Sequence, residues 1–140
     1  QDNAYIKAPK NSYVIVHLFL DDSTPKNGGL VFWAKSHKEG ILKCKVRKSH
    51  KEKIGKNGVS RPGWTILDKE IKRINKSYKK IKIDGKSGWL CFMHGNLVHS
   101  STPNKSKTKD RATYSMAFLN KEANFKNTGF NSVKKKFKLN

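Results

Sequence analysis

Apolar residues along this chain gather in short blocks of strand length, and turns rich in Gly, Pro, Asn and Asp separate the blocks. The clearest block runs from residue 13 to residue 21 and is apolar and β-branched almost throughout, which is typical of a strand covered on both faces. His17 interrupts it, and we predict that this histidine is packed or hydrogen-bonded within the strand. Similar blocks predict strands at 4–8, 30–34, 41–46, 81–83, 89–100 and 112–120.

One segment has the spacing of a helix instead. Apolar residues at positions 66, 67, 71, 74 and 78 fall on one helical face, and Thr65 or Asp68 is its predicted cap. The polar stretch 47–63 contains three glycines and a proline and predicts a loop, long enough to form a lid. Many short strands with one helix, no repeat and no βαβ alternation predict an all-β fold of the jelly-roll or barrel type.

Composition narrows the class of protein. A chain of 140 residues that are 35% hydrophobic predicts one domain with a modest core, and no apolar run reaches the length of a membrane span. Two cysteines cannot build a disulfide scaffold or a Cys-rich zinc site, which fits a cytoplasmic setting. The sequence leaves the substrate and the oligomeric state open.

The net charge of +21 raises the alternative of a nucleic-acid or polyanion-binding module. However, only four of the 31 basic residues are arginines, the residue that nucleic-acid readers favour for two-pronged contacts. The lysines are spread through every segment of the chain. We therefore interpret them mainly as a solvated surface, and we do not expect nucleic acid or a membrane as the partner.

The late segment 88–119 carries the most chemical information. It is interpreted as two strands joined by a polar, lysine-rich turn, with His99 near the end of the first strand and Arg111 at the start of the second. A histidine can hold a metal ion and an arginine can hold a carboxylate, so a shared cavity would suit a metal with a carboxylate-bearing cosubstrate. His94 and His99 are five positions apart and should face opposite sides of a regular strand, whereas Ser101 shares the face of His99.

Three blocks of the sequence resemble the phytanoyl-CoA dioxygenase superfamily, which includes ectoine hydroxylase-like enzymes. The run Gln-Asp-Asn-Ala-Tyr at 1–5 is similar to the residues that follow the His of that family's His-x-Asp motif. Residues 20–30 and 34–40 resemble its strand, Pro-x-Asn-Gly turn, strand and Gly-Ser-His corner. The run His-Gly-Asn-Leu-Val-His-Ser-Ser-Thr-Pro-Asn-Lys-Ser at 94–106, with Arg111, resembles the segment of the distal metal-binding His and the cosubstrate-binding arginine.

The resemblance implies a double-stranded β-helix, a cupin-like jelly roll, over residues 1–120, followed by a basic tail at 121–140. It implies an Fe(II)- and 2-oxoglutarate-dependent dioxygenase that hydroxylates a small organic substrate with O2. Asp2 and His99 would be iron ligands, and Arg111 would bind 2-oxoglutarate with help from the hydroxyl of Ser101. An Asp at position 2 disfavours the halide-binding variant of this iron site.

The family's first iron ligand, a histidine, falls on the position just before Gln1. The resemblance thus implies that the chain corresponds to the C-terminal core of a longer domain, N-terminally truncated and without that domain's first helices and first core strand. Asn3 and Tyr5 are predicted on the substrate side, because they flank the expected metal ligand. A jelly-roll binding protein without catalysis is the remaining alternative.

Overall fold

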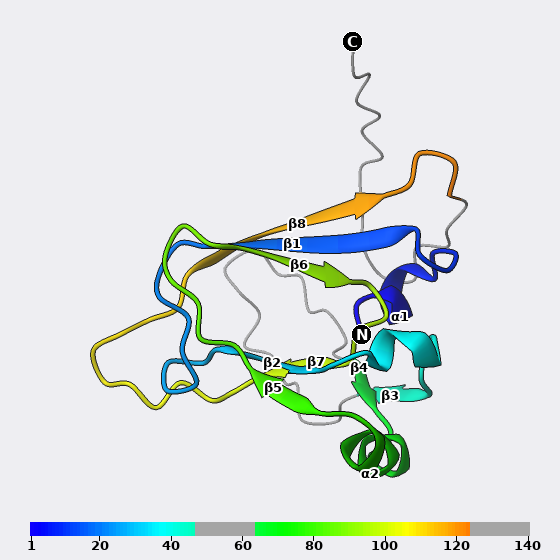
Figure 1. The fold of residues 1–140 in the computed structure, drawn as a ribbon, viewed down its shortest axis with the longest axis horizontal. Helices are drawn as coiled ribbons and strands as arrows, with labels where there is room; N and C mark the ends of the chain where they lie inside the picture. Colours follow the sequence, from blue (N-terminus) through cyan, green and yellow to red (C-terminus); the bar gives the residue numbers. More distant parts are fainter. Residues whose placement is uncertain (47–63, 124–140) are drawn as a thin grey trace.

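The computed structural model describes residues 1–46 and 64–123, and it shows two antiparallel sheets of three strands stacked face to face (Figure 1). In the first sheet, β1 (Tyr13–Phe19) lies between β6 (Leu90–His94) and β8 (Thr113–Leu119). In the second sheet, β2 (Leu30–Trp33) lies between β5 (Lys80–Lys82) and β7 (His99–Ser101). None of the helices in the described part of the chain has the length and apolar character needed to cross a bilayer.

The chain passes repeatedly from one sheet to the other. It runs from β1 in the first sheet to β2 in the second, and later from β5 to β6, β7 and β8, changing sheet at each step. This alternation is the winding expected of a double-stranded β-helix, so the predicted all-β architecture with few helices agrees with the structure.

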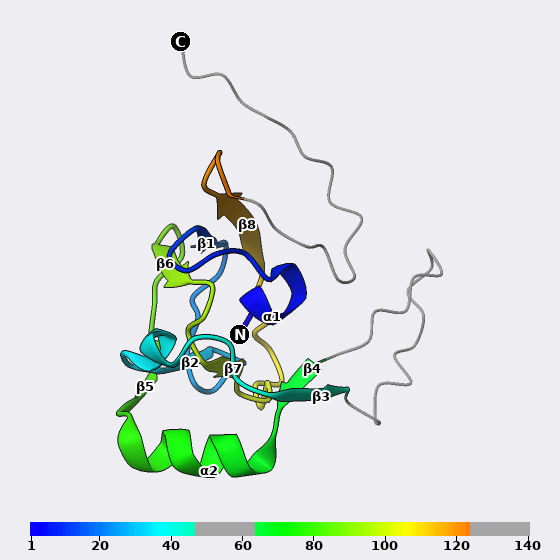
Figure 2. The same ribbon diagram turned by 90° about the vertical axis from the view of Figure 1, so that its right-hand side faces the viewer.

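A separate two-stranded sheet and a helix pack next to the second sheet. A hairpin-like pair, β3 (Cys44–Val46) and β4 (Trp64–Ile66), leads into helix α2 (Asp68–Ser77), which lies beneath the second sheet (Figure 2). The side chain of Ile74 is fully buried against the cluster of Val31, Trp33 and Val98. The indole nitrogen of Trp33 also donates a hydrogen bond of 2.7 Å to Asn75 Oδ1, which fixes the helix on β2.

A second core cluster fills one end of the space between the two sheets. Tyr13 and Ile15 from β1 and Met93 from β6 pack there against Ile6 and Ala8 of the N-terminal segment. The outer face of the first sheet is different, because Phe92 is 69% exposed and Leu90, Tyr114 and Phe118 are each more than half exposed. Burial in the described residues is thus concentrated between the sheets and under the second sheet.

The block predicted as one strand at 89–100 is divided. Strand β6 ends at His94 and β7 begins at His99, and the turn between them carries the chain from one sheet to the other. A Cβ at Gly95 would lie 2.4 Å from the ring of Tyr13, so glycine permits the close approach at which the strand stops. The single-strand prediction was therefore wrong, and His94 and His99 are separated by belonging to different sheets rather than by strand parity.

Two local predictions also require correction. The block 4–8 is not a strand, because Asn3–Ile6 forms the one-turn helix α1 and Asn3 Oδ1 accepts a hydrogen bond of 2.8 Å from the backbone of Ala8. Helix α2 has Leu67 at its N-cap position without a side-chain cap, so neither Thr65 nor Asp68 caps it. Asp68 instead forms an ion pair of 2.7 Å with Lys45 across the hairpin. The predicted loop 47–63 and nearly all of the predicted basic tail lie outside the described residues.

The burial of Ile74 allows the packing of α2 against the core to be tested. Replacing Ile74 with Ala removes methyl groups from a fully buried site and should lower the free energy of unfolding by about 2–5 kcal/mol. The matched control is Ile81→Ala, at a β5 residue that is 39% exposed, where a loss of about 1 kcal/mol or less is expected. Urea unfolding measures both values, and equal losses would contradict the placement of α2 on the core.

Candidate functional site

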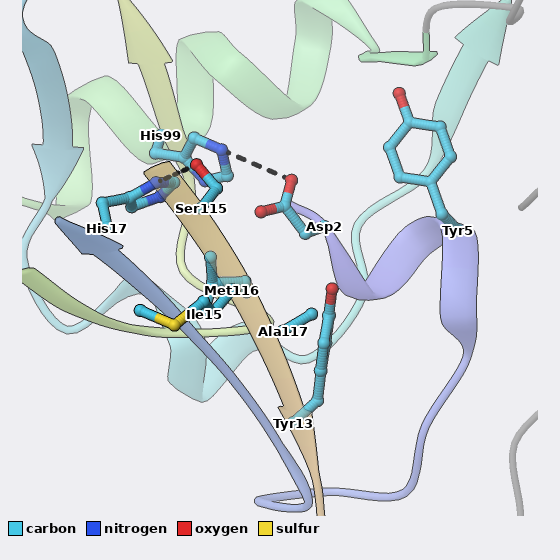
Figure 3. A pocket seen from close by; sticks show the side chains of 9 residues that line it. All are labelled: Asp2, Tyr5, Tyr13, Ile15, His17, His99, Ser115, Met116 and Ala117. Carbon is cyan, nitrogen blue, oxygen red and sulfur yellow. Dashed lines mark hydrogen bonds and ion pairs between the residues drawn. The ribbon is translucent and has the colours of Figure 1, made fainter. Parts of the chain in front are cut away.

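A cavity of about 460 Å³ opens between the two sheets beside the N-terminal segment. Its wall combines apolar side chains with one carboxyl group, two imidazoles and three hydroxyl groups (Figure 3). The lining residues are Asp2, Tyr5, Tyr13, Ile15, His17, His99, Ser115, Met116 and Ala117. The inner face of the β1–β8 pair supplies most of them, because alternate residues of a strand face the same side.

Asp2 and His99 meet at this cavity although they lie far apart in the sequence. Asp2 immediately precedes α1 and His99 begins β7, and Asp2 Oδ1 lies 3.5 Å from His99 Nε2. The other ring nitrogen, Nδ1, lies 3.0 Å from the carbonyl oxygen of Leu97. A carbonyl only accepts hydrogen bonds, so Nδ1 carries the proton of the neutral ring and Nε2 turns a lone pair toward the carboxylate.

The electrostatic surroundings favour this neutral form of His99. Burial lowers the pKa of His99, and the nearby amino group of Gln1 lowers it further, while Asp2 and the Leu97 carbonyl oppose the shift. A neutral Nε2 and a carboxylate oxygen are both electron-pair donors, and they repel each other unless a cation or a proton lies between them. This donor pair therefore fits a metal cation of the kind that imidazole and carboxylate ligands prefer.

Hydrogen bonds from the two neighbours of Asp2 to residues far away in the sequence hold Asp2 in place. The side chain of Gln1 donates to the carbonyls of Gly40 and Asn96 and accepts a bond of 2.9 Å from the backbone N–H of Leu42. On the other side of Asp2, the buried Asn3 donates to Asn96 Oδ1 at 2.8 Å and to the Ala8 carbonyl at 3.0 Å. Both neighbours of Asp2 are thus tied to the scaffold.

The predicted substrate-side residues occupy different positions. Tyr5 lines the cavity, and its hydroxyl accepts a hydrogen bond of 3.0 Å from the backbone N–H of Trp64. Its ring meets that of Trp64 edge to face at 6.4 Å between centroids. Asn3 does not line this cavity, because its amide is directed into the protein and takes part in the bonds that position Asp2.

Arg111 lies next to the cavity rather than in its wall. It precedes β8 by two residues, and its Nη1 donates a hydrogen bond of 3.1 Å to the hydroxyl of Thr113. Within the described residues no carboxylate lies in ion-pair distance of its guanidinium, which leaves the charge available to an anionic ligand. Ser101 lies two residues after His99 on the same strand and is exposed.

Sequence reasoning missed the role of His17 in the cavity wall. This residue faces Ser115 across the β1–β8 pair, and its Nδ1 lies 2.8 Å from Ser115 Oγ. Burial lowers the pKa of His17, Asp2 raises it, and His99 and Arg111 lower it further. The only sequence signal was one imidazole within an otherwise apolar strand, which also fits simple packing.

The described residues contain part of the ligand set that a metal site requires. Asp2 and His99 form a pair, and the described residues contain no group of three or more His, Cys, Asp or Glu side chains placed to hold one metal ion. The same cavity raises the pKa of Tyr13 to about 12 through burial and the Asp2 charge, so its hydroxyl stays protonated at neutral pH. The site therefore offers two protein ligands beside neutral hydrogen-bonding groups.

Comparison with solved structures supports the architecture. The crystal structure of AviO1 from Streptomyces viridochromogenes matches with a TM-score of 0.53 at 19% identity over 81% of this chain and 39% of that one. The crystal structure of EvdMO1 matches with a TM-score of 0.51 at 21% identity over 79% of this chain and 20% of that one. At these identities the likeness shows the fold, and the expected jelly-roll class is confirmed.

Sequence comparison identifies the family. A curated protein described as phytanoyl-CoA dioxygenase, from Arabidopsis thaliana, is 30% identical over 118 residues, which are 83% of this chain and 36% of the relative. The chain thus spans about a third of that relative's length. Residues 1–113 match the family model described as Phytanoyl-CoA dioxygenase (PhyH). On this evidence the chain belongs to the phytanoyl-CoA dioxygenase family.

Proposed function

We propose that this chain forms the core of an Fe(II)- and 2-oxoglutarate-dependent oxygenase that hydroxylates a small organic molecule. The observation that carries the proposal is the meeting of the Asp2 carboxylate with the unprotonated Nε2 of His99 in one cavity. Membership of a dioxygenase family supports the reaction class. Iron dependence and the cosubstrate are inferences from the donor set and the nearby arginine.

The residues would hold the metal and cosubstrate as follows. Asp2 and His99 would supply a carboxylate and an imidazole to Fe(II), two of the three ligands in the arrangement that leaves positions open for a keto acid and dioxygen. Arg111 would bind the far carboxylate of 2-oxoglutarate through its guanidinium, and the exposed hydroxyl of Ser101 would add a hydrogen bond. The Leu97 carbonyl would keep the ring of His99 in the metal-binding tautomer.

When bound, the iron and keto acid would supply oxidative chemistry that converts 2-oxoglutarate to succinate and carbon dioxide and places one oxygen atom of O2 in a substrate C–H bond. The chain's own residues would shape the cavity and exclude water from it. Ile15, Met116 and Ala117 give the cavity apolar walls, while Tyr13 adds a hydroxyl group. A volume of about 460 Å³ is in the range of sites for small molecules, which favours a small organic substrate.

The proposed role of Arg111 is tested by its removal. Arg111→Ala should weaken 2-oxoglutarate binding in the presence of Mn(II), an inert substitute for Fe(II), by about 2–4 kcal/mol, because a charged hydrogen-bonded pair is lost. Arg73→Ala is the matched control, since Arg73 forms surface ion pairs with Glu39 and Glu70 on the far side of the second sheet. Titration calorimetry measures both, and unchanged affinity in Arg111→Ala would refute the assignment.

The metal assignment has its own test. His99→Ala should abolish binding of Mn(II), because the variant retains only the Asp2 carboxylate of the donor pair. His37→Ala is the control, because the ring of His37 lies outside the cavity, against that of His94. Electron paramagnetic resonance of free Mn(II) reports binding. Stoichiometric binding by His99→Ala would show that the Asp2–His99 pair does not hold the metal.

The position of a third ligand leads to a separate prediction. The amino group of Gln1 is buried close to Asp2 and His99, and burial lowers its pKa. A histidine added directly before Gln1 would therefore enter the site, and it should raise Mn(II) affinity at least about tenfold. The same chain with an added alanine provides the control. Equal affinities of the two extended chains would count against a three-ligand site at this position.

A further inference from the structure

The ring of His94 accepts a hydrogen bond from the backbone of the turn between β6 and β7. The donor is the backbone N–H of Asn96, at 2.9 Å from His94 Nδ1. A backbone N–H only donates, so Nδ1 presents a lone pair and the single proton of the neutral ring is on Nε2. Nε2 in turn lies 3.2 Å from the side-chain oxygen of Asn11. The neutral form of His94 thus satisfies both contacts.

The surroundings of His94 disfavour a positive charge on its ring. The ring of His37, in the helical turn after β2, lies against it with 5.0 Å between the centroids. Burial lowers the pKa of His94, and the nearby His37 lowers it further. The other charged groups on this side line a cavity of about 350 Å³ next to His37, and they are Lys10, Lys38 and Glu39. No carboxylate in the described ranges forms an ion pair with His94.

The peptide that His94 holds is the attachment point of the N-terminal segment. Asn96 is buried, and its Oδ1 accepts a hydrogen bond of 2.8 Å from Asn3 while its backbone carbonyl accepts one from Gln1. The backbone N–H of Asn3 also donates to the turn, at 2.9 Å. These bonds lie on both sides of Asp2, so the placement of the turn decides where the Asp2 carboxylate lies.

A proton on Nδ1 removes the support that the ring gives to the turn. Both nitrogens of an imidazolium carry a proton, so Nδ1 would direct a donor toward the N–H of Asn96. Asn96 is only 4% exposed, and a buried N–H that loses its acceptor destabilises the turn that contains it. The ring of His94 is half-buried, so it reaches water by rotating away from Asn96. Protonation therefore separates the ring from the turn.

We propose that His94 is a pH-sensitive switch that controls the attachment of the N-terminal segment. In neutral solution the unprotonated ring accepts the Asn96 N–H, and the turn keeps Asp2 beside His99. In acid the ring takes up a proton, releases Asn96 and loosens the segment that carries Asp2. His94 is a positioning residue, because it acts on Asp2 through the turn. The switch goes beyond the proposed function, since it requires no bound metal or cosubstrate.

The direction of the pH effect follows from the lowered pKa of His94. A histidine whose pKa is lower in the folded than in the unfolded protein contributes its full stabilisation above its ordinary pKa of about 6.5. That contribution is lost as the pH falls from there through the lowered value. The N-terminal segment is therefore attached in neutral solution and loosened in acid.

Two replacements of His94 in the full chain imitate the two states of the switch. The protection factors of the Asn3 and Asn96 amides against hydrogen exchange are measured by NMR from about pH 8 to about pH 4.5. In the wild type they should fall at least about tenfold, with the midpoint at which the His94 ring signals titrate. In His94→Asn the side-chain oxygen accepts the Asn96 N–H without titrating, so protection stays high. His94→Ala has no acceptor and should show low protection throughout.

The neighbouring ring provides an independent check of the mechanism. His37→Asn removes a group that disfavours the charged ring, so the titration midpoint of His94 should rise and the loss of protection should move with it. Equal pH dependence of the Asn96 amide in the wild type and in His94→Asn would overturn the switch. The amides of α2 serve as the internal reference. An equal fall in their protection would mean global acid unfolding, which also overturns a local switch.

The effect on the candidate metal site is measured separately. The ligands Asp2 and His99 titrate in the wild type and in His94→Asn alike, so the ratio of the two Mn(II) affinities isolates the switch. The ratio should be near one in neutral solution and about ten in favour of His94→Asn below the His94 midpoint. A ratio near one at every pH would overturn the control of Asp2 by His94. If neither protein binds Mn(II), the proposed function fails, while the exchange measurements still decide on the switch.

Discussion

The arrangement of the site depends on the attachment of the N-terminal segment to the turn between β6 and β7. Buried Asn3 donates to Asn96 Oδ1, its backbone N–H donates to Gly95, and Gln1 reaches Asn96 and Gly40. Asn96 lies three residues before His99, so this attachment brings Asp2 to the imidazole. Buried polar groups of this kind are stable only when all partners are present, which makes the geometry specific to one placement of the segment.

The same turn connects the packing of the core with the shape of the cavity. Gly95 allows the ring of Tyr13 to lie against the backbone, and Tyr13 in turn forms part of the cavity wall and of the inner core. Immediately after the turn the chain enters the second sheet, where His99 pairs with Phe32. The metal-binding side chain is thus carried by a strand whose start is set by tight packing, which limits its freedom before any ligand binds.

The large positive charge of the chain is not a property of the cavity. Within the described residues no lysine lines it, and its charged and titratable groups are Asp2, His17, His99 and the two tyrosines. Arg111 stands at one side as a cation without a carboxylate partner among the described residues. This polarity, with electron-pair donors at one end and a guanidinium at the other, complements a metal ion chelated by an anionic ligand. Nearly every lysine in the described part of the chain is instead exposed to solvent.

The sequence by itself determined the blocks that become β1, β2, β8 and α2, because side-chain periodicity and turn residues are local properties. Its resemblance to one family pointed to Asp2, His99 and Arg111 as the residues to examine. Only the tertiary structure decided that the block 89–100 is divided between two sheets, that residues 3–6 form a helical turn, and that Asn3 anchors rather than lines the cavity. It alone also revealed that His17 Nε2 is buried without a hydrogen-bond partner among the residues that the structure describes. Such features depend on partners distant in the sequence, and no local pattern encodes which atoms will be left without one.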